Sequence, residues 1–135
     1  MSGPLDDVVV IDLTRALAGP HCGMMLADMG ARVIKVESPG HGDESRGWGP
    51  PFVGPDDDPV STYFLSCNRN KESVTLDLKS DDGRSMLTRL VSHADAILGR
   101  NGRMSKAIET IGRGHIAGEA EPFSIPSTFG PAKPE

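Results

Sequence analysis

The first part of the chain alternates between apolar runs and a helical pattern. Residues 8–13 (VVVIDL) form a near-continuous apolar run, as expected for a strand that is covered on both faces in a parallel sheet. A helix is predicted next, because apolar residues recur at the spacing i, i+3, i+4, i+7 and form one face: Cys22, Met25, Leu26 and Met29. Pro20 suits the first position of this helix, and Gly30 suits its end. Arg32–Glu37 (RVIKVE) is predicted to be a second strand, which completes a right-handed parallel βαβ unit.

The same kind of pattern returns in the second half of the chain. Residues 74–78 (VTLDL) alternate between apolar and polar side chains and predict a third strand. Ser80 can cap a following helix, whose first turn carries two aspartates that favour the helix dipole. Its predicted buried face consists of Met86, Leu87, Leu90, Val91 and Ala94. Residues 96–98 begin a fourth strand, so the order of elements predicts an α/β fold with an at least partly parallel sheet.

Two segments do not follow these patterns. Residues 38–60 are dense in Gly, Pro and Asp and predict a long surface loop, which carries the only tryptophan of the chain, Trp48. Acidic residues in such a loop are mostly solvated, so we expect Asp43 and Glu44 to be solvated rather than part of a metal or acid/base cluster. From Gly99 onward the periodicity declines, with one weak helical patch near residues 106–111.

Composition narrows the class of protein. A chain of 135 residues is long enough for one domain with its own core. The net charge of −5 argues against nucleic acid as a partner, although it leaves room for a small phosphorylated ligand. No secretory signal or membrane-spanning apolar run is present in the sequence, and Cys22 and Cys67 show no paired spacing. The expectation is a cytoplasmic protein with two free thiols, no membrane partner and, since the four histidines lack ligand spacing, no metal.

The predicted topology directs attention to one edge of the sheet. Ligands of parallel α/β sheets collect outside the carboxyl ends of the strands, and three segments leave those ends here: residues 14–19, the loop that starts at Ser38, and residues 78–80. The first of these points at a helix N-terminus, where backbone amides and the helix dipole favour an anion. Lys79 adds a cation at the same edge. A phosphate-bearing ligand is therefore predicted, but the first turn contains a single glycine, Gly19, where a dinucleotide fingerprint has three.

Four motifs in order carry a more specific signal. They are AGP in the first turn, LADMGARVIKVE, GD-x-x-R at residues 42–46 and N-R-N-K-x-S-x-x-LDLK at residues 68–79. With these motifs the chain resembles the N-terminal part of the family III CoA-transferases, such as the formyl-CoA, carnitine and bile-acid CoA-transferases. The 2-methylacyl-CoA racemases share that fold. The resemblance runs from about Leu5 to Leu98 and divides the chain into a CoA-transferase-like α/β region, 1–98, and a non-matching tail, 99–135, which is expected to be irregular.

The resemblance implies a Rossmann-like large domain, incomplete here, in a chain that forms an interlocked homodimer. The ligand would be coenzyme A, moved between an acyl-CoA and a carboxylic acid, with no metal. Carried over by position, the residues that contact CoA are Leu17, Ala18, Ser38, Leu76, Asp77, Leu78 and Lys79. Lys79 would pair with a phosphate, whereas Ser38 stands where well-studied members have an arginine. Glu37 would be an ordinary residue at a strand end.

No catalytic residue can be assigned by matching. The family continues its fourth strand into Glu-Asn-Phe-x-Pro-Gly, whereas this chain has Gly99, Arg100 and Asn101. The nucleophilic aspartate of the transferases, and the acid/base histidine and aspartate of the racemases, belong to a region past that point. We therefore expect a truncated or frame-shifted product that is inactive alone. The alternatives are a relative of the racemases, a non-catalytic module that binds CoA or a nucleotide, and a remnant without function.

Overall fold

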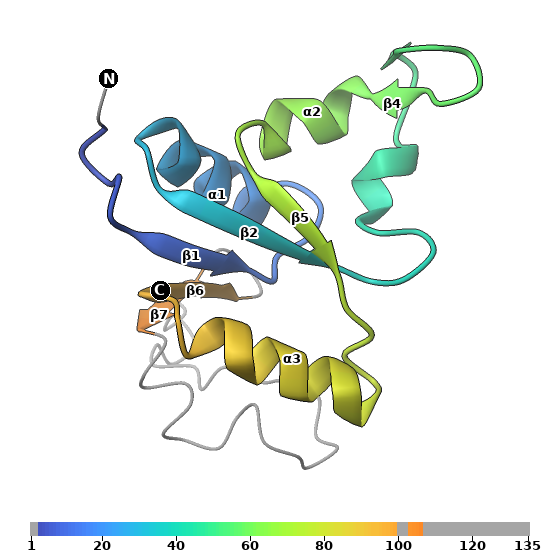
Figure 1. The fold of residues 1–135 in the computed structure, drawn as a ribbon. Helices are drawn as coiled ribbons and strands as arrows, with labels where there is room; N and C mark the ends of the chain where they lie inside the picture. The colour runs from blue at the N-terminus through green and yellow to red at the C-terminus, as the bar shows by residue number, and fades with distance from the viewer. Residues whose placement is uncertain (1–2, 100–102, 107–135) are drawn as a thin grey trace, which may run out of the picture.

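The computed structural model describes residues 3–99 and 103–106, and its centre is a five-stranded sheet in the order β5-β2-β1-β6-β7 (Figure 1). The strands of this sheet are β1 (Val9–Asp12), β2 (Arg32–Glu37), β5 (Glu72–Thr75), β6 (Ala96–Gly99) and β7 (Arg103–Lys106). The first four are parallel, and β7 pairs with β6 in the antiparallel direction. In chain order the parallel strands are arranged 3-2-1-4, which is the order of the first strands in a Rossmann sheet. The predicted α/β fold with a parallel sheet is confirmed.

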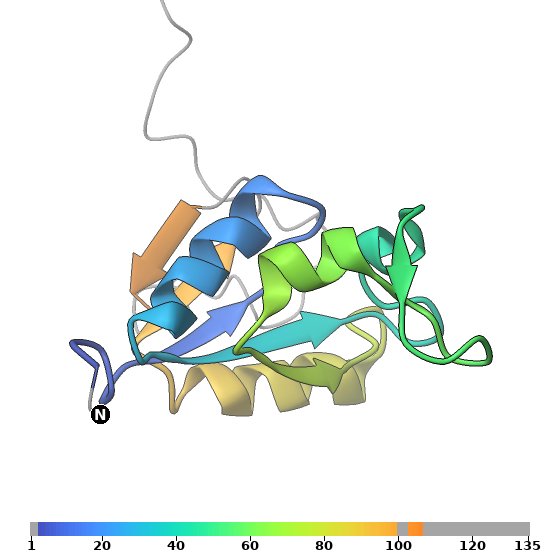
Figure 2. The same cartoon turned by 90° about the horizontal axis from the view of Figure 1, so that it is seen from above.

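Helices cover both faces of the sheet and produce three layers. Their bounds are α1 (Ala18–Asp28), α2 (Thr62–Asn68) and α3 (Asp81–Val91). Seen from above, α1 and α2 lie on one face, and α3 lies on the other (Figure 2). Within residues 3–99 and 103–106, none of the helices has the length and apolar character needed to cross a membrane.

Alternating side chains of the strands build two separate cores. On the α3 face, Ile11, Ile34 and Ile97 pack with Leu87 and Val91 of the helix. On the α1 face, the buried cluster consists of Val10, Ala27, Ala31, Val33 and Leu98. Successive side chains of a strand point to opposite faces, so β1 and β2 contribute to both cores.

The third parallel strand lies earlier in the chain than predicted. The alternation indicated residues 74–78, but β5 begins at Glu72 and ends at Thr75. Its register with β2 is the reason: β2 ends at Glu37, which is the partner of Thr75. One further bond, from the Leu76 amide to the Glu37 carbonyl oxygen (2.9 Å), closes the pair. Residues 76–79 thus leave the sheet and run along its carboxyl edge.

The apolar face predicted for the first helix was only partly correct, since Cys22 and Leu26 pack against the core but the two methionines do not. Met25 is 52% exposed and Met29 is 40% exposed, whereas the buried side of α1 consists of Gly19, Pro20, Gly23, Met24 and Ala27. Close approach explains the difference. A Cβ on Gly19 would lie 2.3 Å from the Thr14 side chain, so only a face of small residues can pack this tightly against the sheet. The helix also begins at Ala18, which makes Pro20 its third residue.

The start of α3 and the end of α1 agree with the sequence. The Ser80 hydroxyl accepts a hydrogen bond from the Gly83 amide at 3.0 Å, as expected for an N-cap, and Gly30 adopts φ +104° just after α1. On the buried face of α3, Leu87 and Val91 are buried, but Met86 is 41% exposed, which corrects its assignment. Cys22 is half-buried, whereas Cys67 is buried.

Residues 38–60 contain more regular structure than the predicted loop. They include the 3-10 helix η1 (Glu44–Gly47) and most of a small hairpin made of β3 (Phe52–Val53) and β4 (Val60–Ser61). The rings of Trp48 and Tyr63 meet edge to face, with centroids 5.0 Å apart. Helix α2, which follows the hairpin, had no counterpart among the predicted elements.

Strand β7 is a regular element within residues 99–135, the segment that was expected to be irregular. Residues 107–135 lie outside the described residues, and so does the weak helical patch at residues 106–111 apart from Lys106. The predicted division of the chain after Leu98 therefore stays a prediction.

Candidate functional site

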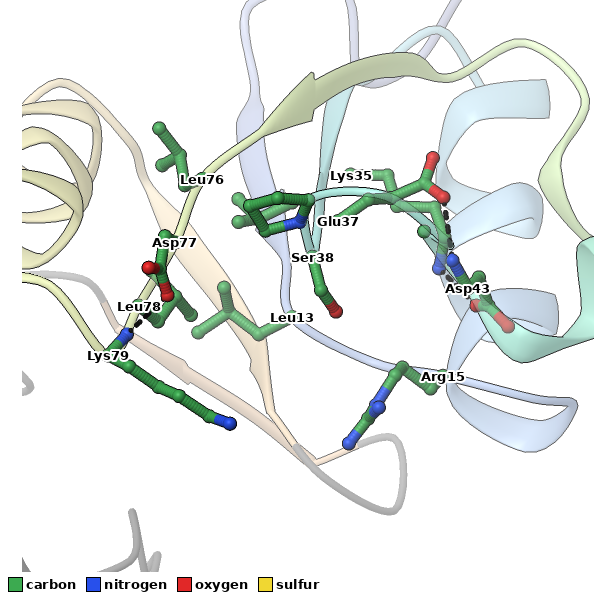
Figure 3. A pocket seen from close by; sticks show the side chains of 13 residues that line it. Leu13, Arg15, Lys35, Glu37, Ser38, Asp43, Leu76, Asp77, Leu78 and Lys79 are labelled. Carbon is green, nitrogen blue, oxygen red and sulfur yellow. Dashed lines mark hydrogen bonds and ion pairs between the residues drawn. The ribbon is translucent and has the colours of Figure 1, made fainter.

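A cavity of about 420 Å³ opens at the carboxyl ends of β1, β2 and β5 (Figure 3). Three segments line it: the chain after β1, the end of β2 with its following loop, and the chain after β5. Their lining residues are Leu13, Arg15, Lys35, Val36, Glu37, Ser38, Pro39, Gly42, Asp43, Leu76, Asp77, Leu78 and Lys79. The cavity lies at the edge of the sheet where α/β proteins bind their ligands.

The structure brings together five of the seven residues that the resemblance assigned to CoA. These five line the cavity: Ser38, Leu76, Asp77, Leu78 and Lys79. The early end of β5 makes this possible, because residues 76–79 are not in the strand. Leu17 and Ala18 are not among the lining residues. Leu17 is the N-cap of α1 and Ala18 is the first helical residue, and both are exposed.

Two cations flank the opening. Arg15 follows β1 and Lys79 follows β5, and their side chains extend into the same open space from opposite sides (Figure 3). Both residues are exposed, and Ser38 between them is neutral. This arrangement favours an anionic ligand. Sequence reasoning singled out Lys79 but missed Arg15, although its place in the turn after the first strand was a usable signal.

A buried ion pair lies beneath the cavity. Lys35 Nζ lies 2.7 Å from Asp43 Oδ2, and the two side chains are 2% and 0% exposed. Lys35 also donates to the Thr14 carbonyl oxygen at 2.9 Å. Burial raises the pKa of Asp43, but the hydrogen bonds from Lys35 and Ser45 outweigh it and hold that pKa below its ordinary value. The expectation that Asp43 is solvated was wrong.

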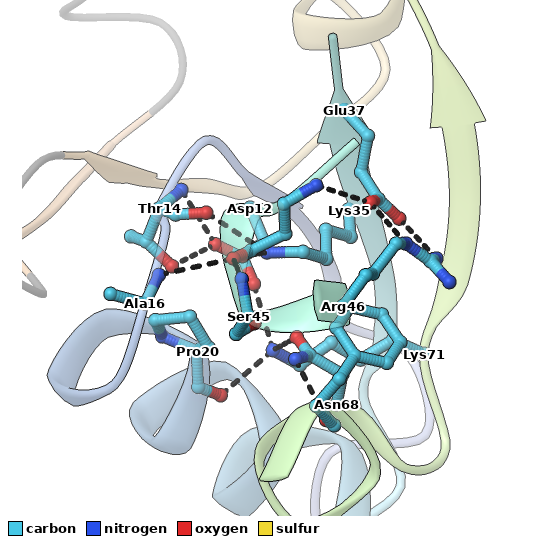
Figure 4. Close-up of polar contacts among 12 residues, drawn as sticks. Asp12, Thr14, Ala16, Pro20, Lys35, Glu37, Ser45, Arg46, Asn68 and Lys71 are labelled. Carbon is cyan, nitrogen blue, oxygen red and sulfur yellow. Dashed lines mark hydrogen bonds and ion pairs between the residues drawn. The ribbon is translucent and has the colours of Figure 1, made fainter. Parts of the chain in front are cut away.

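A second buried pair joins β1 to α1 and α2, which share one face of the sheet (Figure 4). Lys71 Nζ donates to Asp12 Oδ2 at 2.9 Å, to the Pro20 carbonyl oxygen at 2.7 Å and to Asn68 Oδ1 at 2.9 Å. Burial lowers the pKa of Lys71, and the negative charge of Asp12 opposes that shift. All three ammonium hydrogens have acceptors, so this lysine has a structural role.

Glu37 accepts hydrogen bonds from three residues, two of them at η1 and one in β5. Its carboxylate accepts from Arg46 Nε and Nη2, each at 2.7 Å, from the Asp43 amide at 2.9 Å and from the Ser73 hydroxyl at 2.6 Å. Burial raises its pKa, but these donors, Arg46 foremost, lower it to about 2. Its side chain is 3% exposed. Glu37 is therefore a buried centre of the network and not an ordinary strand-end residue.

The sequence contained a signal for this network. Val33, Lys35 and Glu37 share one face of β2, and the first of them is in the core of that face. Charged residues that continue a buried row must meet other charges, since an isolated buried charge is very costly. Among the described residues, no group of three or more His, Cys, Asp and Glu side chains could hold a metal ion.

The fold and the cavity define an α/β protein with a cation-flanked cavity at the carboxyl edge of its sheet, and comparison with known proteins shows its family. The family model for CoA-transferase family III matches residues 5–114. The chain belongs to this family. The match extends past Leu98, where the motifs quoted from the sequence end.

Individual relatives agree with this membership. The chain is 50% identical over 95 residues to the human succinyl-CoA:glutarate CoA-transferase, which covers 70% of the chain and 21% of that enzyme. It is 52% identical over 97 residues to the succinyl-CoA:mesaconate CoA-transferase of Haloarcula hispanica, covering 71% and 24% of the two chains. The crystal structure of a CAIB/BAIF family protein from Brucella suis superposes with a TM-score of 0.68 at 47% identity, over 72% of this chain and 25% of that one. The chain spans about a quarter of the length of these relatives or less.

Proposed function

We propose that this chain is the N-terminal, CoA-binding portion of a CoA-transferase that moves CoA between an acyl-CoA and a carboxylic acid. The observation that carries the proposal is the cavity at the carboxyl edge, which combines two flanking cations with five of the residues assigned to CoA by resemblance. CoA is an anion with several phosphate groups, and it needs cations at the mouth of its site. Family membership supports the same ligand.

Each lining residue has a role suited to CoA. Arg15 and Lys79 pair with phosphate oxygens, where charge-assisted hydrogen bonds are the strongest available contacts. Leu76 and Leu78 offer apolar surface, and the Ser38 hydroxyl is a hydrogen-bond donor and acceptor. Leu17 and Ala18 contribute from outside the cavity, because the first turn of α1 presents backbone amides to an anion. Asp77 shapes the segment, since its carboxylate accepts the Lys79 amide at 3.0 Å.

The reaction class follows from the relatives. The human and Haloarcula enzymes described above are named for transfer of CoA from a succinyl group to a second dicarboxylic acid. This favours transfer over the racemase-type alternative, and succinyl-CoA is the first donor to test. The residues that perform the chemistry have no match within these 135 residues. The activity expected of the isolated chain is therefore CoA binding without turnover.

Calorimetric titration of the 135-residue chain with CoA and with NAD tests the proposal. We expect CoA to bind and NAD not to bind. Arg15→Gln and Lys79→Gln are each expected to weaken CoA binding roughly tenfold, because each removes one charge-assisted contact to phosphate. Arg89→Gln is the matched control, since it removes an exposed cation from the far end of α3 and is expected to leave the affinity unchanged.

The outcomes separate the rival functions. Binding of NAD in preference to CoA would support a nucleotide-binding module and overturn the proposal. Binding of neither ligand would indicate a remnant without function. A transferase rate above background would contradict the expectation that the isolated chain lacks turnover.

The proposal extends to assembly and location. By family resemblance the whole protein forms an interlocked homodimer, and we place it in the cytoplasm. Light scattering coupled to size-exclusion chromatography measures the mass in solution, and a monomer at all concentrations would contradict the dimer for this chain.

A further inference from the structure

One wall of the cavity is a short loop whose last residue is hydrogen-bonded to its first. The loop runs from Glu37 to Asp43, and Ser38, Pro39 and Gly42 within it line the cavity. The Asp43 amide donates back to the Glu37 carboxylate at 2.9 Å, and the Gly42 amide donates to the Ser38 carbonyl oxygen at 3.1 Å. A single carboxylate therefore holds both ends of this wall.

Gly42 allows the loop to close this tightly. It adopts φ +65°, and a Cβ at this position would lie 2.5 Å from Glu37 Oε2 and 3.0 Å from Arg46 Nε. A side chain would separate the backbone from the carboxylate and from the guanidinium. The path of the loop thus depends on the contact between Glu37 and Arg46.

Arg46 determines where the Glu37 carboxylate lies. Its guanidinium donates to both oxygens in a bidentate pair, each bond at 2.7 Å, and also lies 3.9 Å from the centre of the Phe64 ring. Phe64 is buried in α2 and provides a fixed surface beneath the guanidinium. Arg46 is not one of the residues that line the cavity, so its effect on the cavity passes through Glu37.

The geometry points to Arg46 as a positioning residue that, through Glu37, holds the Ser38–Gly42 wall of the cavity in its ligand-binding conformation and so sets the affinity for CoA. The inference rests on the proposed function for the identity of the ligand. Arg46 itself does not contact CoA.

The same loop is connected to the turn that carries Arg15. Asp43, at the end of the loop, accepts the Ala16 amide at 3.3 Å and pairs with Lys35. Ala16 has φ +68°, a conformation that L-residues rarely adopt and that surrounding contacts must maintain. Displacement of the loop is therefore expected to disturb the cation on the opposite side of the opening as well.

The charged groups around Glu37 allow a second test, which is the dependence of CoA binding on pH. The cation that faces the Glu37 carboxylate is Arg46 of η1. Its other two partners are neutral: the Ser73 hydroxyl of β5 and the Asp43 amide. The Asp43 carboxylate pairs with Lys35 of β2 instead. Without Arg46, the pKa of Glu37 rises, because burial remains and the strongest opposing donor is lost. Protonated Glu37 is a poorer acceptor for the Asp43 amide, so in such a variant the wall loosens as the pH falls.

The experiment compares two bidentate arginine–glutamate pairs on β2. Arg32 donates to both carboxylate oxygens of Glu72, at 2.8 and 3.0 Å, at the end of the strand away from the cavity. Arg46→Met and Arg32→Met are matched variants, and Arg46→Lys retains the charge without the bidentate geometry. CoA affinity is measured by calorimetry, and hydrogen exchange of the Asp43 amide is measured without ligand.

We expect Arg46→Met to weaken CoA binding about tenfold, Arg46→Lys to restore part of the affinity and Arg32→Met to bind like the unmodified chain. The ratio of affinities between the unmodified chain and Arg46→Met is expected to grow as the pH falls, because the pKa of Glu37 is higher in the variant than in the unmodified chain. Exchange of the Asp43 amide is expected to accelerate in Arg46→Met and not in Arg32→Met.

Equal CoA affinity in the unmodified chain and in folded Arg46→Met would overturn the inference. So would an equal loss in Arg46→Met and Arg32→Met, or an affinity ratio that does not change with pH. If the unmodified chain does not bind CoA, the proposed function fails for this chain. Hydrogen exchange then decides separately, because unchanged protection of the Asp43 amide in Arg46→Met would refute the role of Arg46 in holding the wall.

Discussion

The two faces of the central sheet are held by different interactions. On the α3 face, buried aliphatic side chains of β1, β2 and β6 pack against Leu87 and Val91. On the face covered by α1 and α2, the amino halves of the strands are also apolar, but the carboxyl halves carry buried charges: Asp12, Lys35 and Glu37. Both faces reach the cavity: the charged residues Lys35 and Glu37 line it together with Leu13, Val36 and Leu76, which belong to the apolar cluster on the α3 face.

The difference shows how one sheet can combine stability with a defined site. Apolar packing is non-directional and contributes in proportion to the area buried. Charge-assisted hydrogen bonds require particular distances and angles, so they fix where loops lie. Buried ion pairs add little net stability compared with apolar packing, but loss of one partner is severe. The buried charges at the carboxyl ends of the strands therefore determine where the loops lie. The apolar α3 face contributes stability to the fold that does not depend on pH.

Removal of the Lys35 charge is expected to have the largest effect. Lys35→Met leaves the buried Asp43 carboxylate without its cation, and the free energy of unfolding is expected to fall by about 3–5 kcal/mol. Urea unfolding measures this change. The double variant Lys35→Met, Asp43→Asn is the control and should regain part of the loss, because no uncompensated charge remains. A loss as small as that of a surface substitution would contradict the contrast between the two faces.

Low pH is expected to reduce the free energy of unfolding, because the buried Glu37 carboxylate becomes protonated. The pKa of this carboxyl is about 2 in the folded chain, against an ordinary value of 4.5. Because the folded pKa is depressed, the contribution is fully present above about pH 4.5 and is lost as the pH falls toward 2. Its upper limit is about 3 kcal/mol. Unfolding free energies across this window, for the unmodified chain and for Glu37→Gln, should differ by an amount that shrinks as the pH falls. A constant difference would show that Glu37 titrates normally.

A truncation on the apolar face is expected to have the smallest dependence on pH of the three changes. Leu87→Ala removes a buried side chain from the α3 face and should lower the free energy of unfolding by about 2–3 kcal/mol through lost burial and an unfilled cavity. The loss should be the same at neutral and at mildly acidic pH, since no charged group is involved. Chemical unfolding at both pH values measures it. A cost that varied with pH would indicate that the two faces are coupled.

Local features of the sequence were sufficient for much of the fold. The strand at Arg32–Glu37, the Ser80 cap and the Gly30 stop were all correct, because each depends on residues only a few positions apart. The helix at α2 was missed, since seven residues carry too little periodicity to recognise. The buried face of α1 was partly misassigned because apolar periodicity favoured the methionines, whereas close packing required glycine.

The candidate site was only partly visible in the sequence. The carboxyl edge and Lys79 could be predicted, because parallel strands bring their ends together whatever their side chains are. The role of Glu37 was not predicted, since its donors are separated from it by six, nine and 36 positions and follow no local pattern. The Lys71–Asp12 pair joins residues 59 positions apart, and no local pattern links them.

The sequence by itself determined the order of the four parallel strands and the two long helices, and membership of a family, because hydrophobic periodicity and motif spacing are properties of short segments. Only the tertiary structure decided which charges meet and where the cavity wall lies. The physical reason is that a buried charge is stable only beside a specific partner, and loop closure over long separations selects that partner. In this chain, closure of one loop brings Asp43 and Arg46 to the Glu37 carboxylate, and the pairing of β5 with β2 brings Ser73 to it.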